Sequence, residues 1–372
     1  MNKKLLAAAI AAAVVAAPAA FAESTVYGKF HVSVDSVDDD SKDVDSYFAN
    51  SRSSRLGFKG SEDLGNGLKA IFQFETTVLV DGGNDQSVGT GFGSQRNTFI
   101  GLAGDFGTFL VGRHDTPAKI AFYASGTENL GDSILDLNPG SLNPIGVISE
   151  FRANNAIAYV SPNFSGFTVA AAMIPGEQSG EASSSRTVCT PISPTANDCV
   201  TEPGQANDND GIADHYSLGA MYSGNGLKAG IGYEKKAQLD NLNGEKNVKE
   251  EFVQAGASYT MNNFTVGANY EKAWSYGWEW SNDYTAWAVT GRAQFGNNAI
   301  NLVYTTSKQD PENPPAFGRE KIETDGWGIG ADHAFSKRTT AYVAYASNSE
   351  DNKTTNEDDD NKVFSLGMIH NF

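Results

Sequence analysis

From residue 23 onward, apolar and polar residues alternate with a period of two along short segments. In the segment 26–35, the apolar positions are Val26, Phe30, Val32 and Val34, and mostly polar side chains stand between them. Alternate residues of a β-strand point to the same face, so each segment is expected to be a strand with one apolar face and one polar or small face. We count sixteen such segments, beginning near residues 25, 46, 67, 94, 107, 154, 166, 215, 226, 250, 263, 282, 298, 322, 338 and 361.

The connections between these segments alternate in length, with seven short turns and eight long loops. The long loops cover roughly 36–45, 80–93, 114–153, 174–214, 237–249, 275–281, 309–321 and 350–360. A soluble sandwich has little reason to place every long loop at one end, whereas a barrel inserted into an outer membrane has short periplasmic turns and long external loops. The polar faces carry many charges, which a water-filled lumen can solvate and a closed core cannot. These charged residues include Lys29, Arg55, Glu75, Arg96, Glu271 and Arg292.

The pattern therefore predicts an all-β fold, a 16-stranded antiparallel transmembrane β-barrel. Closure is required because an open sheet edge in lipid leaves backbone groups unpaired, and sixteen strands leave room for an aqueous channel. The mean hydropathy of −0.36 excludes a helical protein with several membrane spans. The 27 basic residues against 45 acidic ones give a formal charge of −18, which argues against nucleic acid as a partner.

The first residues predict export. Lys3 and Lys4 precede an apolar run over 5–19, and Ala20-Phe21-Ala22 supplies an A-x-A cleavage site. These are the three parts of a secretory signal peptide, with an N-terminal anchor helix as the alternative. We expect a signal peptide over 1–22 and the barrel over 23–372, located in the outer membrane of a Gram-negative bacterium.

Several longer motifs point to a family. They are Val26-Tyr27-Gly28-Lys29, the run from Ser54-Arg55-Leu56-Gly57 to Gly67, Arg96-Asn97-Thr98-Phe99, Gly112-Arg113-His114-Asp115, Ala156-Ile157-Ala158-Tyr159, and the terminal Gly367-Met368-Ile369-His370-Asn371-Phe372. Together they resemble the general trimeric porins of Gram-negative outer membranes, most closely the group found in Neisseria and its relatives. The resemblance implies a homotrimer with one pore per subunit, in contact with outer-membrane lipid and lipopolysaccharide. A last strand ending in Phe372 resembles the signal read by the barrel-assembly machinery.

The same resemblance implies that the third long loop, about 114–153, folds into the barrel and narrows it. By motif match, the basic wall of this constriction is Lys29, Arg55, Arg96 and Arg152. Charges of opposite sign across a narrow gap produce a transverse field that acts on passing solutes. The alternative is that some of these arginines pair with loop acids in a structural role. The expected acidic side comprises Glu75, which could also orient an arginine, with Asp115, Glu128, Asp132 and Asp136.

Two cysteines, Cys189 and Cys199, lie in the fourth long loop. In an oxidising compartment they are expected to form a disulfide. No resident cofactor or metal site is expected. The acidic runs 38–40, 208–210 and 357–360 are candidates for binding divalent cations that bridge lipopolysaccharide, and a solvated acidic rim is the alternative.

The predicted function is a general diffusion porin, a water-filled channel for passive passage of ions and small hydrophilic solutes, and not an enzyme. The chain has no Walker lysine, G-x-S-x-G or H-E-x-x-H motif. The alternatives are a substrate-selective channel with an inward ladder of aromatics, an outer-membrane hydrolase, or an adhesin barrel with a plugged interior. Ion selectivity stays open here, because the acidic excess favours cations and the arginine cluster favours anions.

Overall fold

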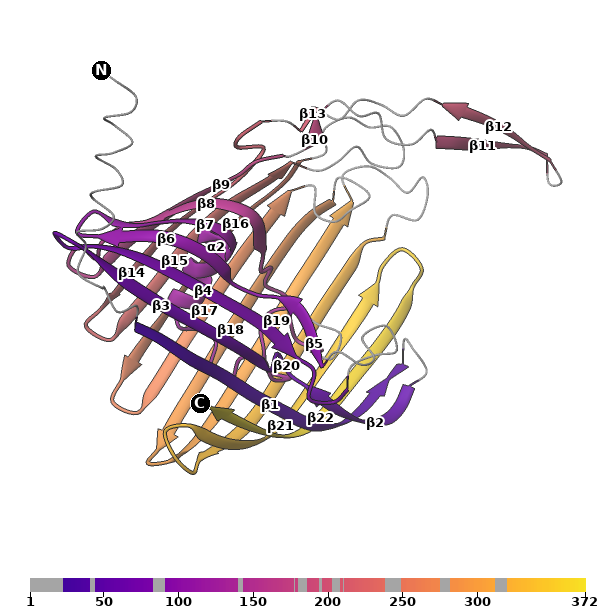
Figure 1. Ribbon diagram of the computed structural model, residues 1–372. Helices are drawn as coiled ribbons and strands as arrows, with labels where there is room; N and C mark the ends of the chain where they lie inside the picture. The colour runs from indigo at the N-terminus through magenta and orange to yellow at the C-terminus, as the bar shows by residue number, and fades with distance from the viewer. Residues whose placement is uncertain are drawn as a thin grey trace, which may run out of the picture.

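The computed structural model describes residues 23–40, 44–82, 91–139, 143–176, 178–179, 186–193, 196–202, 208–209, 211–237, 249–274, 282–311 and 320–372. The predicted signal peptide, 1–22, lies outside these described residues. Most of the described chain is β-strand (Figure 1). Among the described residues, no helix is both long and apolar enough to cross a membrane.

The elements are β1 (Glu23–Asp39), β2 (Val44–Ser51), β3 (Arg55–Gly65), β4 (Leu68–Val78), β5 (Phe92–Gln95), β6 (Thr98–Gly104), β7 (Gly107–Asp115), α2 (Pro117–Ala124), β8 (Arg152–Val160), β9 (Phe167–Ile174), β10 (Gln178–Ser179), β11 (Arg186–Ser193), β12 (Ala196–Glu202), β13 (Asp208–Asn209), β14 (His215–Gly224), β15 (Leu227–Ala237), β16 (Lys249–Met261), β17 (Phe264–Trp274), β18 (Asn282–Phe295), β19 (Asn298–Pro311), β20 (Ile322–Ala334), β21 (Thr339–Asn352) and β22 (Glu357–Asn371).

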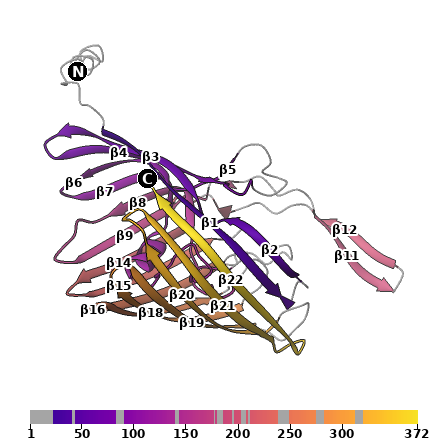
Figure 2. The ribbon, with the colours of Figure 1, turned by 90° about the horizontal axis from the view of Figure 1, so that it is seen from below.

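The main sheet is a closed antiparallel barrel. It contains 18 strands, but β2 and β3 both pair with β1, and β5 and β6 both pair with β4, so each of these two pairs is one interrupted strand and the barrel has sixteen. The last strand, β22, pairs with β1 over Lys29–Asp39, and Figure 2 shows the two side by side. The predicted 16-stranded antiparallel barrel is confirmed.

The apolar faces of the strands point outward. On β1, Val26 and Val34 are 68% and 56% exposed, whereas His31 and Asp35 are fully buried at 0%. A soluble barrel would reverse this arrangement, since its apolar face would fill the interior. Apolar side chains outside and polar ones inside are what a barrel in lipid requires.

Two of the long loops are shorter than the sequence indicated. The acidic residues 38–39 belong to the end of β1, and 357–360 belong to the start of β22. Asp38 pairs with Asp45 of β2, and Asp358 pairs with Asp351 of β21. Backbone hydrogen bonding therefore continues through these acidic runs, and they form strand ends rather than loops.

The fourth long loop contains two small two-stranded antiparallel sheets, one of β10 with β13 and one, a hairpin, of β11 with β12. In this hairpin the backbone of Cys189 lies directly opposite that of Cys199. The side chains of both cysteines lie outside the described residues, so the disulfide stays a prediction.

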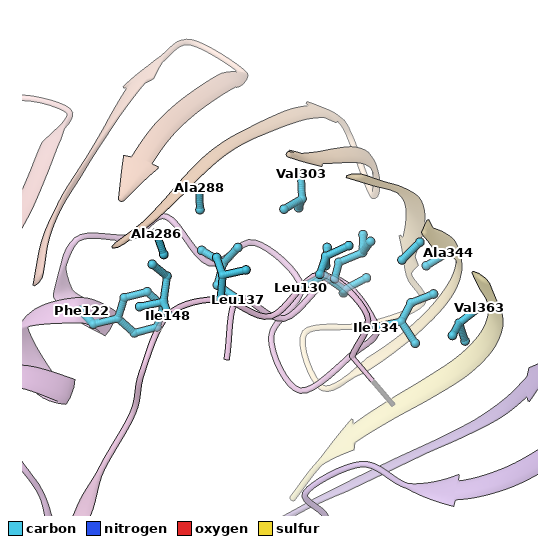
Figure 3. Packing of buried hydrophobic residues seen from close by; sticks show 14 of the residues in the cluster. Phe122, Leu130, Ile134, Leu137, Ile148, Ala286, Ala288, Val303, Ala344 and Val363 are labelled. Atoms are coloured by element: carbon cyan, nitrogen blue, oxygen red, sulfur yellow. The ribbon is translucent and has the colours of Figure 1, made fainter. Parts of the chain in front are cut away.

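The segment 116–151, between β7 and β8, lies against the inner wall. Its helix α2 rests on β14 and β15, where glycines leave room for it. A Cβ on Gly219 would clash with the Pro117 carbonyl oxygen, and one on Gly230 would clash with that of Ala121. The rest of the segment buries large aliphatic side chains against small ones of the wall (Figure 3). These are Leu130, Ile134, Leu137 and Ile148 of the segment, against Ala286, Ala288, Val303, Ala344 and Val363 of the wall.

Candidate functional site

Basic side chains meet on the wall formed by the first strands. Lys29 of β1 and Arg55 of β3 are directly opposite each other in the sheet. Arg96 follows β5, and Arg152 begins β8. Two like charges directly opposite each other in a sheet repel, so the Lys29–Arg55 pair requires a counter-charge.

That counter-charge is Asp132, from the segment 116–151. One of its carboxylate oxygens accepts hydrogen bonds from Lys29 Nζ at 2.6 Å and from Arg55 Nη2 at 2.7 Å. Burial raises the pKa of Asp132, but the adjacent charges of Lys29 and Arg55 outweigh this and lower the pKa to about 2. The carboxylate is therefore ionised at neutral pH, and the loop is tied to the basic wall.

A β-bulge adds a further arginine to this wall. Val32 of β1 pairs with Ser51 and Lys29 pairs with Arg55, so three steps along β1 match four along its partner. The extra residue lies at the break around Ser53, whose φ of 49° is in the left-handed region. The bulge lets Arg52 and Arg55 both point inward, although residues three apart in a regular strand face opposite sides.

Arg52 is buried and joins the wall to the loop. Its Nη2 donates to Asp35 Oδ2 at 2.8 Å, its Nε to Ser33 Oγ at 2.8 Å, and its Nη1 to Asn143 Oδ1 at 3.1 Å. Arg52 was not predicted at this wall, because the parity of a regular strand places it on the face opposite Arg55. Two arginines three residues apart in one predicted strand were the available signal.

Glu75 lies among the basic residues rather than across from them. It projects from β4, where Arg96 Nε donates to its Oε1 at 2.6 Å and the Tyr27 hydroxyl donates to its Oε2 at 2.9 Å. The expected grouping of Glu75 with the acidic side of a gap does not match this position, whereas orientation of an arginine by Glu75 does.

Asp115 and Arg152 meet at the two ends of the inward segment. Arg152 Nη2 lies 2.9 Å from Asp115 Oδ1, and Lys119 Nζ lies 3.3 Å from the same oxygen. Lys119, on α2, also lies 2.8 Å from Glu150 Oε2. Lys119 was not predicted, because no sequence signal indicated that a helix opens the loop and places this residue one turn after Asp115.

The remaining loop acids form a separate group. Glu128, Asp136 and Glu150 each bring one carboxylate oxygen within 4.8 Å of the other two. Burial and the neighbouring Asp136 carboxylate raise the pKa of Glu128, and burial also raises the pKa values of Asp136 and Glu150. The acids of the segment thus divide into those paired with bases, which include Glu150 with Lys119, and the Glu128 and Asp136 carboxylates, which lie beside Glu150.

A cavity of about 450 Å³ runs between the wall and the loop. Its lining is charged and polar, including Arg52, Arg96, Lys119, Asp132, Asp136 and Glu150. Such a lining can pass water and small charged solutes, and it offers little apolar surface for binding.

Comparison with known proteins decides the family. Residues 7–353 match the family model described as Gram-negative porin. The chain belongs to the Gram-negative porin family. This porin is 29% identical over 366 residues to the major outer membrane protein P.IB of Neisseria gonorrhoeae, with 92% of each chain covered. It is also 33% identical over 174 residues to the outer membrane porin protein 32 of Delftia acidovorans, covering 45% of this chain and 48% of that one.

Solved structures share the fold of this porin. The anion-selective porin from Comamonas acidovorans superposes with a TM-score of 0.67 at 20% identity, covering 94% of this chain and 100% of that one. The outer membrane protein OmpT of Vibrio cholerae, solved in its trimer form, superposes with a TM-score of 0.60 at 15% identity, covering 94% and 99%. The predictions of a porin, an outer-membrane location and a channel rather than an enzyme are confirmed by the family match and the named relatives.

Proposed function

We propose that this porin is a passive channel for ions and small hydrophilic solutes, narrowed between the basic wall and the segment 116–151. The constriction residues are Lys29, Arg52, Arg55, Arg96 and Arg152 on the wall side. The observation that carries the proposal is the bridge from Asp132 to Lys29 and Arg55, which holds the loop against charged groups beside an open polar cavity.

We further propose a preference for anions. Lys29 and Arg55 share the single carboxylate of Asp132, so one positive charge of the two is not balanced there. Arg96 is balanced by Glu75, and Arg52 by Asp35. Low-dielectric walls focus the field at a narrow point, whereas acidic residues at the external rim are screened within about 10 Å at 0.1 M salt. A relative of the same fold is described as anion-selective, which agrees with this proposal.

We also propose how the protein assembles in the membrane. The apolar outer face fits outer-membrane lipid and a homotrimer, and one solved structure of this fold is a trimer. The Phe372 backbone exchanges hydrogen bonds of 3.1 Å with Gly28, and its ring centroid lies 5.4 Å from that of Phe30. This position at the seam of the barrel suits a signal for the barrel-assembly machinery. Cleavage of the signal peptide after Ala22, and divalent cations bridging the acidic strand ends to lipopolysaccharide, complete the proposal.

A substrate-selective channel finds less support. Two tyrosines on the inward faces of the strands are both engaged in structural hydrogen bonds. The Tyr27 hydroxyl donates to Glu75 at 2.9 Å, and the Tyr284 hydroxyl donates to the Val147 carbonyl at 2.6 Å. Tyr284 therefore supports the inward loop, and the pair does not form an aromatic track for a ligand.

Single-channel recording in a planar bilayer tests the proposal. We expect large conductance steps that occur in threes, and a reversal potential under a KCl gradient whose sign reports chloride preference. A reversal potential of the opposite sign would overturn the anion preference while leaving the channel in place. Folded protein that conducts no current would mean a plugged barrel and would favour the adhesin alternative.

A further inference from the structure

The acid group Glu128, Asp136 and Glu150 lies in the inward segment, apart from the basic wall. One carboxylate oxygen from each residue lies within 4.8 Å of the other two. We propose that these three residues bind a divalent cation of the calcium class beside the channel. The site is distinct from the acidic strand ends at the external rim.

Charge balance is the first reason. A buried carboxylate is costly unless a positive charge or a proton compensates it. Asp132 has Lys29 and Arg55, and Asp115 has Arg152. Within the described part of the chain, by contrast, no lysine or arginine forms an ion pair with Glu128 or Asp136.

Unused oxygens are the second and independent reason. The Glu150 side chain is only 8% exposed, and its Oε2 pairs with Lys119 at 2.8 Å. Its Oε1 is buried and has no hydrogen-bond partner, and the same holds for Oε1 of Glu128. A buried anionic oxygen without a partner is rare in a folded protein and calls for a ligand.

The spacing fits a metal ion better than a shared proton. Calcium binds oxygens at about 2.3–2.6 Å, so two ligand oxygens on one ion lie at most about 5 Å apart. A proton joins only two oxygens, about 2.5–2.7 Å apart, whereas a single ion can contact all three carboxylates at once. Asp136 and Glu150 also line the open cavity, from which water can complete the six to eight ligands that calcium takes.

The loop holds two of the three carboxylates in place before any ion arrives. Asp136 accepts the backbone N–H of Asp132 at 2.6 Å and that of Asn138 at 2.8 Å. The Glu128 carboxylate folds over Gly131, where an added Cβ would stand 2.6 Å from Glu128 Oε2. Side chains fixed in this way lose little freedom on binding.

Lys119 sets the expected affinity. Its ammonium group stands beside Glu150 and repels a second cation, so we expect binding in the range of about 10⁻⁴ to 10⁻³ M, as in extracellular calcium modules. Removing this charge with Lys119→Met should tighten calcium binding, because Glu150 would then offer both oxygens. Arg152 remains on Asp115 in that variant and keeps that acid paired.

Calcium binding to the folded, detergent-solubilised protein tests the site directly. After removal of metal with EDTA, equilibrium dialysis with ⁴⁵Ca²⁺ should find about one ion per chain in this range. Glu128→Gln should abolish this binding, and Lys119→Met should tighten it about tenfold. The control replaces Asp358, Asp359 and Asp360 by asparagine, which removes charge from the external strand end and should leave the site intact.

The outcomes separate the site from its alternatives. Binding that persists in Glu128→Gln and disappears in the external control would place the ion at the rim and overturn the proposal. Absence of binding to the wild-type chain would mean that the acids hold a proton only. Failure of Lys119→Met to tighten binding would place the ion away from Glu150 and overturn the proposal. If Glu128→Gln does not fold, the Lys119→Met comparison still decides the matter.

Calcium can also be detected through its effect on channel current, a measurement that rests on the proposed function. Equilibrium dialysis of calcium does not depend on that function. A bound dication adds two positive charges beside the basic wall, so calcium should shift the reversal potential further toward anions. Protein that binds calcium yet shows no channel current would leave the site standing and overturn the channel. Protein that conducts current and binds no calcium would support the channel and overturn the calcium site.

Discussion

The Asp132→Asn variant tests the charge balance at the constriction with the least change of shape. Asparagine has the size of aspartate and tolerates the left-handed backbone that residue 132 adopts, with φ of 60°. Its amide oxygen can still accept hydrogen bonds from Lys29 and Arg55. Because the pKa of Asp132 is about 2, the substitution removes one full negative charge at neutral pH.

The size of the effect follows from Coulomb's law. An ion passing about 8 Å from the carboxylate in water interacts with it by about 0.5 kcal/mol. The substitution favours an anion and disfavours a cation by this amount, so the permeability ratio shifts by about 1 kcal/mol, or about fivefold. Screening at 0.1 M salt, with a Debye length of about 10 Å, reduces the change to about twofold.

The assay is the reversal potential of single channels under a KCl gradient at pH 7. We expect the anion-to-cation permeability ratio of Asp132→Asn to rise about twofold to fivefold over that of the wild type. Asp358→Asn removes the same charge at the external end of β22 and should change the ratio much less. An unchanged ratio in Asp132→Asn, or a shift toward cations, would refute the assignment of Asp132 to the narrow part of the channel.

Three further predictions concern the support of this site. Arg52→Met should destabilise the barrel by about 3–5 kcal/mol, because it leaves the 0%-exposed Asp35 carboxylate without its ion pair. Thermal unfolding followed by circular dichroism measures this loss, and adding Asp35→Asn should recover most of it. Gly230→Ala should lower single-channel conductance, because its Cβ displaces helix α2 into the lumen, whereas Gly291→Ala, with its nearest contact at 4.0 Å, should have no effect. The cysteine pair of the fourth long loop should give no thiol labelling in denaturant, and two labels per chain after reduction.

The alternation of residue types was sufficient to predict the faces of the strands. Val34 and Asp35 are neighbours in sequence, yet one is 56% exposed and the other fully buried. Successive side chains of a strand face lipid and lumen in turn, and lipid favours apolar side chains whereas the lumen favours polar ones. An alternation with a period of two therefore identifies both faces of the strand. The ends of strands were harder to predict, since acidic runs such as 357–360 resemble loops but continue the backbone ladder beyond the membrane.

Local periodicity and motifs were enough to predict the barrel, its inner and outer faces and four of the five basic residues on its wall. Which charges meet depends on the tertiary structure. Asp132 pairs with residues 103 and 77 positions away, Arg52 turns inward through a bulge at Ser53, and Lys119 reaches Glu150 from a helix within a loop. These contacts depend on the path of the loop across the lumen, which packing against the far wall fixes and no local pattern encodes.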